Sequence, residues 1–338
     1  MKKYIITAVL CALGSLNGMD QPPTREPREW MAQEYSENNK FQTSCFSHWL
    51  EKHKIPTQGK SIVSFGCGTG EIEAELAKKA RHVHGTDASK NMIDYAKKTH
   101  GNPTNNLFFT HCFAEDFTSQ PIYDLALASC CFHWFADQPK ALKAIANSLK
   151  YGGSFFANIE TESNQKSPGH LVFEDMNRDI PGLKRLLSML SSPTGSSHPT
   201  FADLHTMLFD AGLTDIKSSV ETYDWTMTEQ EWRNAQLPLL LSTPGAQWII
   251  NSTQDHIGYA SSQAVFWMMS MSEEEKKQHD APFFPESNHE LIQKIRANNF
   301  CRYLFNNYLN RCLTKMQKNE NGTYTWKYET TVVLAQKK

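Results

Sequence analysis

A glycine-rich turn constrains this chain more than any other feature. The segment SFGCGTG, residues 64–70, places three glycines at alternate positions directly after the apolar pair Ile62-Val63. Glycine adopts backbone conformations that other residues avoid, and it lets a backbone approach a ligand closely. Such a turn at the end of a buried strand is typical of parallel sheets, whose ligands bind beyond the carboxyl ends of the strands. The turn therefore predicts an α/β protein with its site at this position.

Strands and helices are predicted to alternate through the first half of the chain. Residues 30–54 have helical spacing of their apolar and aromatic positions, and the region after Gly70 continues as a helix to about residue 79. Ser89 and Asp137 stand where helix N-caps are expected. The predicted strands are short apolar runs at residues 61–65, 82–86, 107–111, 123–129 and 154–159, the last beginning after Gly152-Gly153. This order predicts a doubly wound, mostly parallel sheet.

The second half of the chain follows a different pattern. It is predicted to form helices over residues 173–190 and 201–211, a strand over 214–225, mostly helices over 227–318, and a last strand over 323–335. The helical stretch would then be inserted before the final strand. We expect it to cap the ligand crevice of the sheet.

Composition excludes some classes of function. The chain has 338 residues with a formal net charge of -2, so it lacks the basic footprint of a nucleic-acid-binding protein. None of its eight cysteines forms a C-x-x-C pair, and none of its thirteen histidines lies in an H-E-x-x-H motif. We therefore expect neither a nucleic-acid partner nor a metal site.

The N-terminus allows two interpretations. Residues 1–18, MKKYIITAVLCALGSLNG, have two lysines, an apolar run and then small residues, which is the pattern of a signal peptide. The run is too short to span a bilayer as a helix. Met19, however, begins a plausible cytosolic protein, in which case residues 1–18 reflect a misplaced start. The first interpretation predicts export and the second predicts a cytoplasmic location.

The glycine turn by itself leaves two cofactors open. Dinucleotides and S-adenosylmethionine are both bound at such turns, and Asp87, at the end of the second predicted strand, can accept hydrogen bonds from the ribose of either. The turn lacks the helix-packing glycine that a dinucleotide site has in third position, which favours S-adenosylmethionine. An NAD-dependent oxidoreductase remains an alternative.

Motifs after the third and fourth predicted strands add a family resemblance. They are FAEDF at residues 113–117 and HWFADQPKALKAIANSLKYGG at residues 133–153. Together with the G-C-G-T-G turn and Asp87, they resemble class I S-adenosylmethionine-dependent methyltransferases, in the branch of trans-aconitate and juvenile hormone acid methyltransferases. The resemblance implies a Rossmann-like seven-stranded sheet. Its parts would be a cofactor-binding core over residues 30–160, pocket helices with the sixth strand and the cap over 161–322, and the last strand over 323–336.

The resemblance also implies roles in binding S-adenosyl-L-methionine. The glycines of the turn would hold the methionine part, Asp87 the ribose, and Met92 and Ala114 the adenine. The full set of implied cofactor contacts is Tyr35, Gly66, Cys67, Gly68, Asp87, Ala88, Met92, Ala114 and Glu115.

A second motif points to the methyl acceptor. The segment YSENNKFQ, residues 35–42, is similar to the Y-S-x-x-N-x-x-Q segment of juvenile hormone acid methyltransferases. In that group the glutamine and the tryptophan of H-W orient a substrate carboxylate, which implies this role for Gln42 and Trp134. Both side chains are neutral N–H donors. The implied partner is a small-molecule carboxylic acid, whereas His133 acting as a base would suit a hydroxyl or amine acceptor.

Two departures from the family pattern weaken the expected cofactor contacts. Ser64 stands where the family usually has an acidic residue that helps to secure the turn and the amino group of the cofactor. Phe113 replaces an acid that often contacts adenine. A catalytically weak or silent binding or effector protein is therefore the second alternative.

Overall fold

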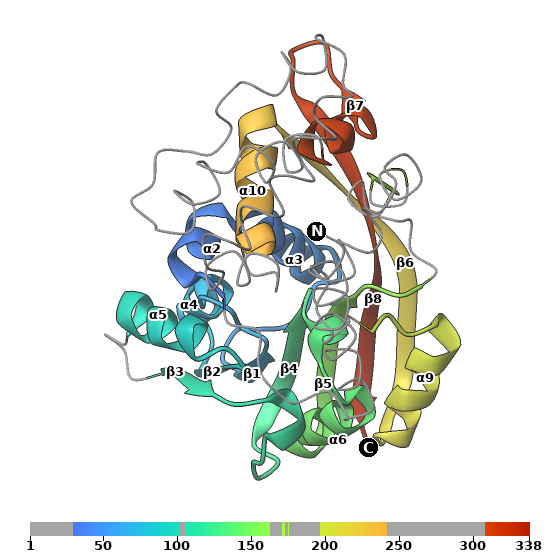
Figure 1. The fold of residues 1–338 in the computed structure, drawn as a ribbon. Helices are drawn as coiled ribbons and strands as arrows, with labels where there is room; N and C mark the ends of the chain where they lie inside the picture. Colours follow the sequence, from blue (N-terminus) through green and yellow to red (C-terminus); the bar gives the residue numbers. More distant parts are fainter. Residues whose placement is uncertain (1–29, 102–105, 163–170, 173–174, 176–196, 242–307) are drawn as a thin grey trace, which may run out of the picture.

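The computed structural model describes residues 30–101, 106–162, 171–172, 175, 197–241 and 308–338 (Figure 1). The N-terminal segment 1–18, most of the helix predicted over 173–190 and most of the predicted cap lie outside these residues.

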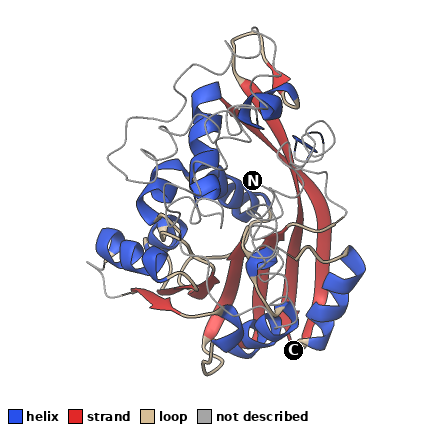
Figure 2. Ribbon diagram, viewed as in Figure 1, coloured by secondary structure: helices blue, strands red, loops and turns tan. Residues whose placement is uncertain are grey.

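One mixed sheet forms the centre of the protein (Figure 2). The strand order is β3-β2-β1-β4-β5-β8-β6, and the two-residue β7 pairs with β8. The bounds are β1 Ser61–Phe65, β2 His82–Asp87, β3 Leu107–His111, β4 Tyr123–Ser129, β5 Leu149–Ile159, β6 Leu213–Met227, β7 Gln317–Lys318 and β8 Tyr324–Lys337. Strands β1 to β5 pair in parallel, and β8 runs antiparallel to both of its long neighbours, β5 and β6. The predicted doubly wound, mostly parallel sheet with seven principal strands is confirmed.

The helices that precede and follow these strands begin where the sequence predicts. Ser89 Oγ accepts the N–H of Met92 at 3.4 Å, and the carboxylate of Asp137 accepts the N–H of Lys140 at 2.9 Å, so both predicted N-caps are present. The helices are α2 Ala32–Asn38, α3 Lys40–Lys52, α4 Glu71–Ala77, α5 Lys90–His100, α6 Gln138–Ser148, α9 Phe201–Asp210 and α10 Glu229–Leu241, with 3-10 turns η2 Ala114–Asp116 and η3 Phe132–Trp134 and a helical segment over 308–314. No helix in the described part of the chain is long and apolar enough to cross a membrane.

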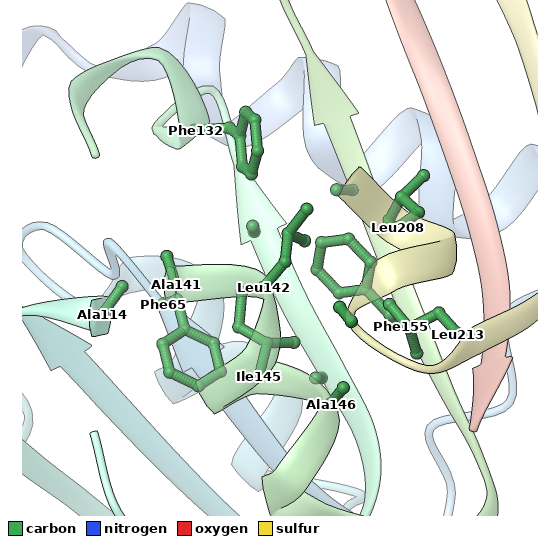
Figure 3. Packing of buried hydrophobic residues seen from close by; sticks show 14 of the residues in the cluster. Phe65, Ala114, Phe132, Ala141, Leu142, Ile145, Ala146, Phe155, Leu208 and Leu213 are labelled. Carbon is green, nitrogen blue, oxygen red and sulfur yellow. The ribbon is translucent and has the colours of Figure 1, made fainter. Parts of the chain in front are cut away.

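Both faces of the sheet are buried, which explains why its central strands are almost continuously apolar. On one face, Phe65 and Phe155 pack against α6 and α9 through side chains such as Leu142 and Leu208 (Figure 3). On the other face, residues such as Ile62 and Phe156 pack against α3, α4 and α5. This two-sided packing holds the carboxyl ends of β1, β2 and β4 side by side, where the glycine turn lies.

The strand β5 differs from its prediction. It begins at Leu149 rather than at Ser154, and Gly152-Gly153 lies inside it. The pairing of β5 with β4 shifts in register between Tyr123 and Leu125, and Gly152 has a φ of +74°. The glycine pair therefore permits an irregularity within the strand instead of ending the preceding helix.

The hairpin-like ribbon of β6 and β8 extends beyond the core. Its register runs from Leu213 opposite Lys337 to Met227 opposite Tyr324. The far half packs on α3, where the ring of Phe41 lies 4.9 Å from that of Trp326 and 5.0 Å from that of Tyr328. The ribbon therefore brings residues from the end of the chain against the N-terminal helices.

Candidate cofactor and acceptor site

The glycine turn between β1 and α4 can be built only with glycine at two of its positions. Gly66 and Gly70 have φ angles of +66° and +86°, which side-chain-bearing residues rarely adopt. A Cβ at Gly66 would lie 2.5 Å from the Cβ of Cys131, and one at Gly70 would lie 2.6 Å from the ring of Phe109. The turn is thus pressed against the segment that follows β4 and against β3.

Asp87 joins the turn to the next helix. Its Oδ2 accepts the N–H of Gly68 at 2.9 Å, and its Oδ1 accepts the N–H of Ser89 at 2.8 Å. A carboxylate offers about four lone-pair positions, which suits a group that accepts from several donors at once. The structure therefore brings together two of the residues to which the sequence assigns cofactor contacts, Gly68 and Asp87, and holds the carboxylate in one orientation.

Helix α2 and the residue that follows it pack on the turn. A Cβ at Gly68 would lie 3.4 Å from the ring of Tyr35. Ser36 Oγ donates to the carboxylate of Glu71 at 2.6 Å, and Asn39 Nδ2 donates to Thr69 Oγ1 at 3.3 Å. Burial is the main cause that raises the pKa of Tyr35, so this phenol stays protonated. The Y-S-x-x-N spacing thus corresponds to three contacts with one loop.

The residues assigned to adenine lie beyond β2 and β3. Met92 and Ala114 are buried near the starts of α5 and η2. The carbonyl oxygen of Ala88 accepts from His111 Nε2 at 2.8 Å. Glu115 is also buried, but its carboxylate accepts the N–H of Asp137 at 3.1 Å. The carboxylate of Glu115 therefore ties η2 to the start of α6, a contact that the sequence did not predict.

Cys67 lies in the turn, where burial raises the pKa of its thiol well above the usual range.

The two residues assigned to the acceptor lie on different elements. Trp134, in η3, is 38% exposed, and its ring meets that of Trp30 edge-on at 6.1 Å. Trp30 in turn meets Tyr35 at 5.7 Å, so aromatic rings run from Trp134 to the glycine turn. Gln42, in α3, is half-buried, and its Oε1 has no hydrogen-bond partner among the described residues. The described contacts do not join Gln42 to Trp134, and their pairing stays a prediction.

Sequence reasoning missed a polar cluster beyond β4 and β5. Cys130 has a φ of +48°, its N–H donates to Asn158 Oδ1 at 3.2 Å, and Asn158 Nδ2 donates to its sulfur at 2.9 Å. Tyr328 Oη lies 3.9 Å from the same sulfur and donates to a carboxylate oxygen of Glu160 at 3.1 Å. Burial raises the pKa of Tyr328 well above its usual range. Only the pairing of β5 with β8 brings these residues together, so no local sequence signal could have identified them.

Two histidines continue this cluster toward Trp134. Nδ1 of His198 lies 3.9 Å from the second carboxylate oxygen of Glu160. The ring of His198 stacks on that of His133 with centroids 5.3 Å apart and an interplanar angle of 13°. His133 is buried, whereas its neighbour Trp134 is partly exposed. The ring centroids of these two adjacent side chains lie 4.7 Å apart, so His133 links His198 to Trp134.

The segment that contains the glycine turn matches a known family. Residues 63–155, from β1 to β5, match a family model described as a methyltransferase domain. This segment is therefore similar to methyltransferase domains. It contains the glycine turn, Asp87, η2 and η3, and the curated proteins that it resembles include named methyltransferases. Tyr35, Gln42 and Glu160 lie outside the matched residues.

Curated relatives resemble part of this chain at low identity. An uncharacterised methyltransferase of Schizosaccharomyces pombe is 26% identical over 143 residues, which cover 40% of this chain and 53% of that protein. Malonyl-[acyl-carrier protein] O-methyltransferase 1 of Ilyobacter polytropus is 28% identical over 112 residues, which cover 31% and 41% of the two chains. The chain thus spans about half the length of the curated relatives it matches. A solved structure, the YcgJ protein of Bacillus subtilis, is 13% identical with a TM-score of 0.47 over 87% of this chain and 98% of that one, which adds nothing to the fold described above.

The segment from β1 to β5 has groups that suit S-adenosylmethionine. The oriented carboxylate of Asp87 suits the two ribose hydroxyls, and the buried apolar side chain of Met92 suits the face of adenine. A carboxylate of α4, that of Glu73, is buried and has an oxygen without a hydrogen-bond partner among the described residues. The residues present therefore fit this cofactor.

Proposed function

We propose that this protein transfers a methyl group from S-adenosylmethionine to a carboxylate oxygen of a small organic acid. The observation that carries the proposal is the continuous path from Trp134 through Trp30 and Tyr35 to the glycine turn, where Asp87 is already oriented. An indole N–H at the outer end of this path is a neutral donor, which can hold a carboxylate without protonating it.

The residues of the turn and of β2 would hold the cofactor. Asp87 would bind the ribose, Met92 and Ala114 would border the adenine, and Tyr35 would cover Gly68 and exclude water from the loop. When bound, S-adenosylmethionine supplies an electrophilic methyl group on its sulfonium. The part played by this chain is then to align the acceptor and to exclude water.

Gln42 and Trp134 would align the acceptor through their side-chain N–H groups. A carboxylic acid with an ordinary pKa of about 4 is already ionised at neutral pH, so its oxygen needs no general base. The spacing of the segment at residues 35–42 supports this proposal, as does its resemblance to juvenile hormone acid methyltransferases. Two of the relatives carry the name malonyl-[acyl-carrier protein] O-methyltransferase, and a malonyl thioester has one free carboxylate.

Turnover with a panel of acceptors tests the proposal. Purified protein is incubated with S-adenosylmethionine labelled on its methyl group and with small carboxylic acids, alcohols or amines. Label is expected in base-labile methyl esters of one or more acids. Methylation of alcohols or amines alone would contradict the carboxylate proposal. Binding of the cofactor without turnover on any acceptor would favour a silent binding protein.

A second acceptor class is favoured by the contact between Glu160 and His198. A histidine beside a carboxylate can take a proton from a hydroxyl or amine acceptor while the carboxylate stabilises the imidazolium that forms. The two mechanisms differ in their dependence on pH. A carboxylate acceptor predicts a rate that is flat from about pH 6 to 9, because the acid is ionised throughout. A histidine base predicts a rate that depends on pH within this range, and His198→Asn should remove that dependence.

A further inference from the structure

The buried carboxylate of Glu73 lies near Cys67 of the glycine turn, and the proposed function leaves its partner unassigned. Glu73 is in α4, the helix that starts at the end of the turn, and it is 2% exposed. Its Oε2 is buried and has no hydrogen-bond partner among the described residues. The other glutamates of α4 differ: Glu71 accepts from Ser36 and Thr69, and Glu75 pairs with Lys78 at the surface.

The groups around Glu73 are neutral or acidic. Ser64, at the end of β1, makes a side-chain hydrogen bond to this carboxylate. The nearest charges are those of Glu71 on the same helix and Asp87 at the end of β2. The thiols of Cys67 in the turn and Cys131 after β4 also lie close enough for Glu73 to raise their pKa values. None of the groups that most affect the pKa of this carboxylate is a cation.

A carboxylate in such surroundings is costly unless a cation or several hydrogen bonds compensate for its burial. The methionine part of S-adenosylmethionine carries an α-ammonium group, and the turn that would hold it runs from Gly66 to Gly70, the residue that caps α4. Ser64 leaves no carboxylate at the end of β1, and its hydroxyl points to Glu73 instead.

We propose that Glu73 supplies, from α4, the anionic partner for the α-ammonium group of the cofactor. This inference rests on the proposed use of S-adenosylmethionine. It assigns the recognition of that amino group to a residue of the helix rather than of the strand, so the loss of an acid at Ser64 does not leave the methionine part without a counter-charge.

Isothermal titration with two ligands tests the assignment. S-adenosylmethionine has the ammonium group, whereas 5′-methylthioadenosine has the same adenosine but no amino-acid part. Glu73→Gln keeps the size and hydrogen bonding of the side chain and removes its charge. We expect this variant to bind S-adenosylmethionine about tenfold more weakly, or worse, and 5′-methylthioadenosine within about twofold of the wild type. The exposed Glu75→Gln is the matched control and should change neither affinity.

Further arms separate this proposal from a purely structural role. Decarboxylated S-adenosylmethionine keeps the amino group. The Glu73→Gln variant should therefore bind it more weakly than the wild type does, by the same factor as for S-adenosylmethionine. The double variant Ser64→Asp, Glu73→Ser returns a carboxylate to β1 and should recover most of the lost affinity. Should Glu73→Gln fail to fold, the uncharged and similarly long Glu73→Met is titrated instead, with the same selective loss expected.

Each outcome decides a different question. Equal losses for both ligands, or no loss for S-adenosylmethionine, would overturn the assignment of Glu73. Failure of the wild-type protein to bind S-adenosylmethionine while it binds another nucleotide would overturn the proposed function itself.

Discussion

Replacing Glu73 by glutamine is expected to stabilise the ligand-free protein, although it removes a buried carboxylate that accepts a hydrogen bond. Burial raises the pKa of Glu73 from 4.5 to about 7, the charges of Glu71 and Asp87 add to this effect, and the bond from Ser64 opposes it. An acid whose pKa is higher in the folded than in the unfolded state binds more protons when folded. Its contribution to stability is therefore present below the unfolded pKa and is lost as pH rises through the folded pKa.

The size of this loss follows from the two pKa values. At about 1.36 kcal/mol for each pKa unit, ionised Glu73 costs roughly 3 kcal/mol at neutral and alkaline pH. Glutamine has nearly the same shape and no charge. The variant should therefore gain little at about pH 5 and roughly 2–3 kcal/mol at about pH 8, relative to the wild type.

Urea unfolding measures this difference. The free energy of unfolding of wild type, Glu73→Gln and Glu75→Gln would be determined between about pH 5 and pH 8 from tryptophan fluorescence and circular dichroism. Glu75 is exposed, so its variant controls for the loss of one negative charge. A stability difference between Glu73→Gln and wild type that does not change with pH, or a variant that is less stable at the alkaline end, would refute the reasoning.

Three other outcomes are expected. Gly66→Ala should lower the free energy of unfolding by about 2–4 kcal/mol, measured in thermal or urea melts, because the new Cβ is crowded and the φ angle is unfavourable for alanine. Gly152→Ala should lower it by only about 1–2 kcal/mol, because its Cβ would meet nothing within 4 Å and only the φ angle is unfavourable. Asp87→Ala should weaken S-adenosylmethionine binding in titration by about tenfold or more, and an unchanged affinity in the folded variant would place the cofactor elsewhere. Gln42→Ala and Trp134→Ala should each lower kcat/KM by about tenfold or more in methyl-transfer assays, and retention of full activity in both would exclude them from the acceptor site.

Features that depend on neighbouring residues could be predicted from the sequence. The first four strands, the caps at Ser89 and Asp137 and the glycine turn after β1 lie where the patterns place them. Apolar periodicity, capping side chains and the φ preference of glycine act over a few residues. The elements that they specify can therefore be predicted without knowing the fold. The contact between the turn and Asp87 also follows, because parallel strands end at the same edge of a sheet.

Features that depend on packing could not be predicted in this way. The bond between the carboxylate of Glu115 and the start of α6 was not predicted, and β5 continues through a glycine pair that was expected to end the preceding helix. In the sequence alone, Glu73 is one of three alternating glutamates at the start of a helix, and only the packing of α4 on the sheet makes it the buried one. Glu160 meets Tyr328 across 168 residues of chain. Many tertiary contacts together decide which side of a helix is buried and which distant strand pairs with a given strand. A short stretch of sequence does not specify those contacts.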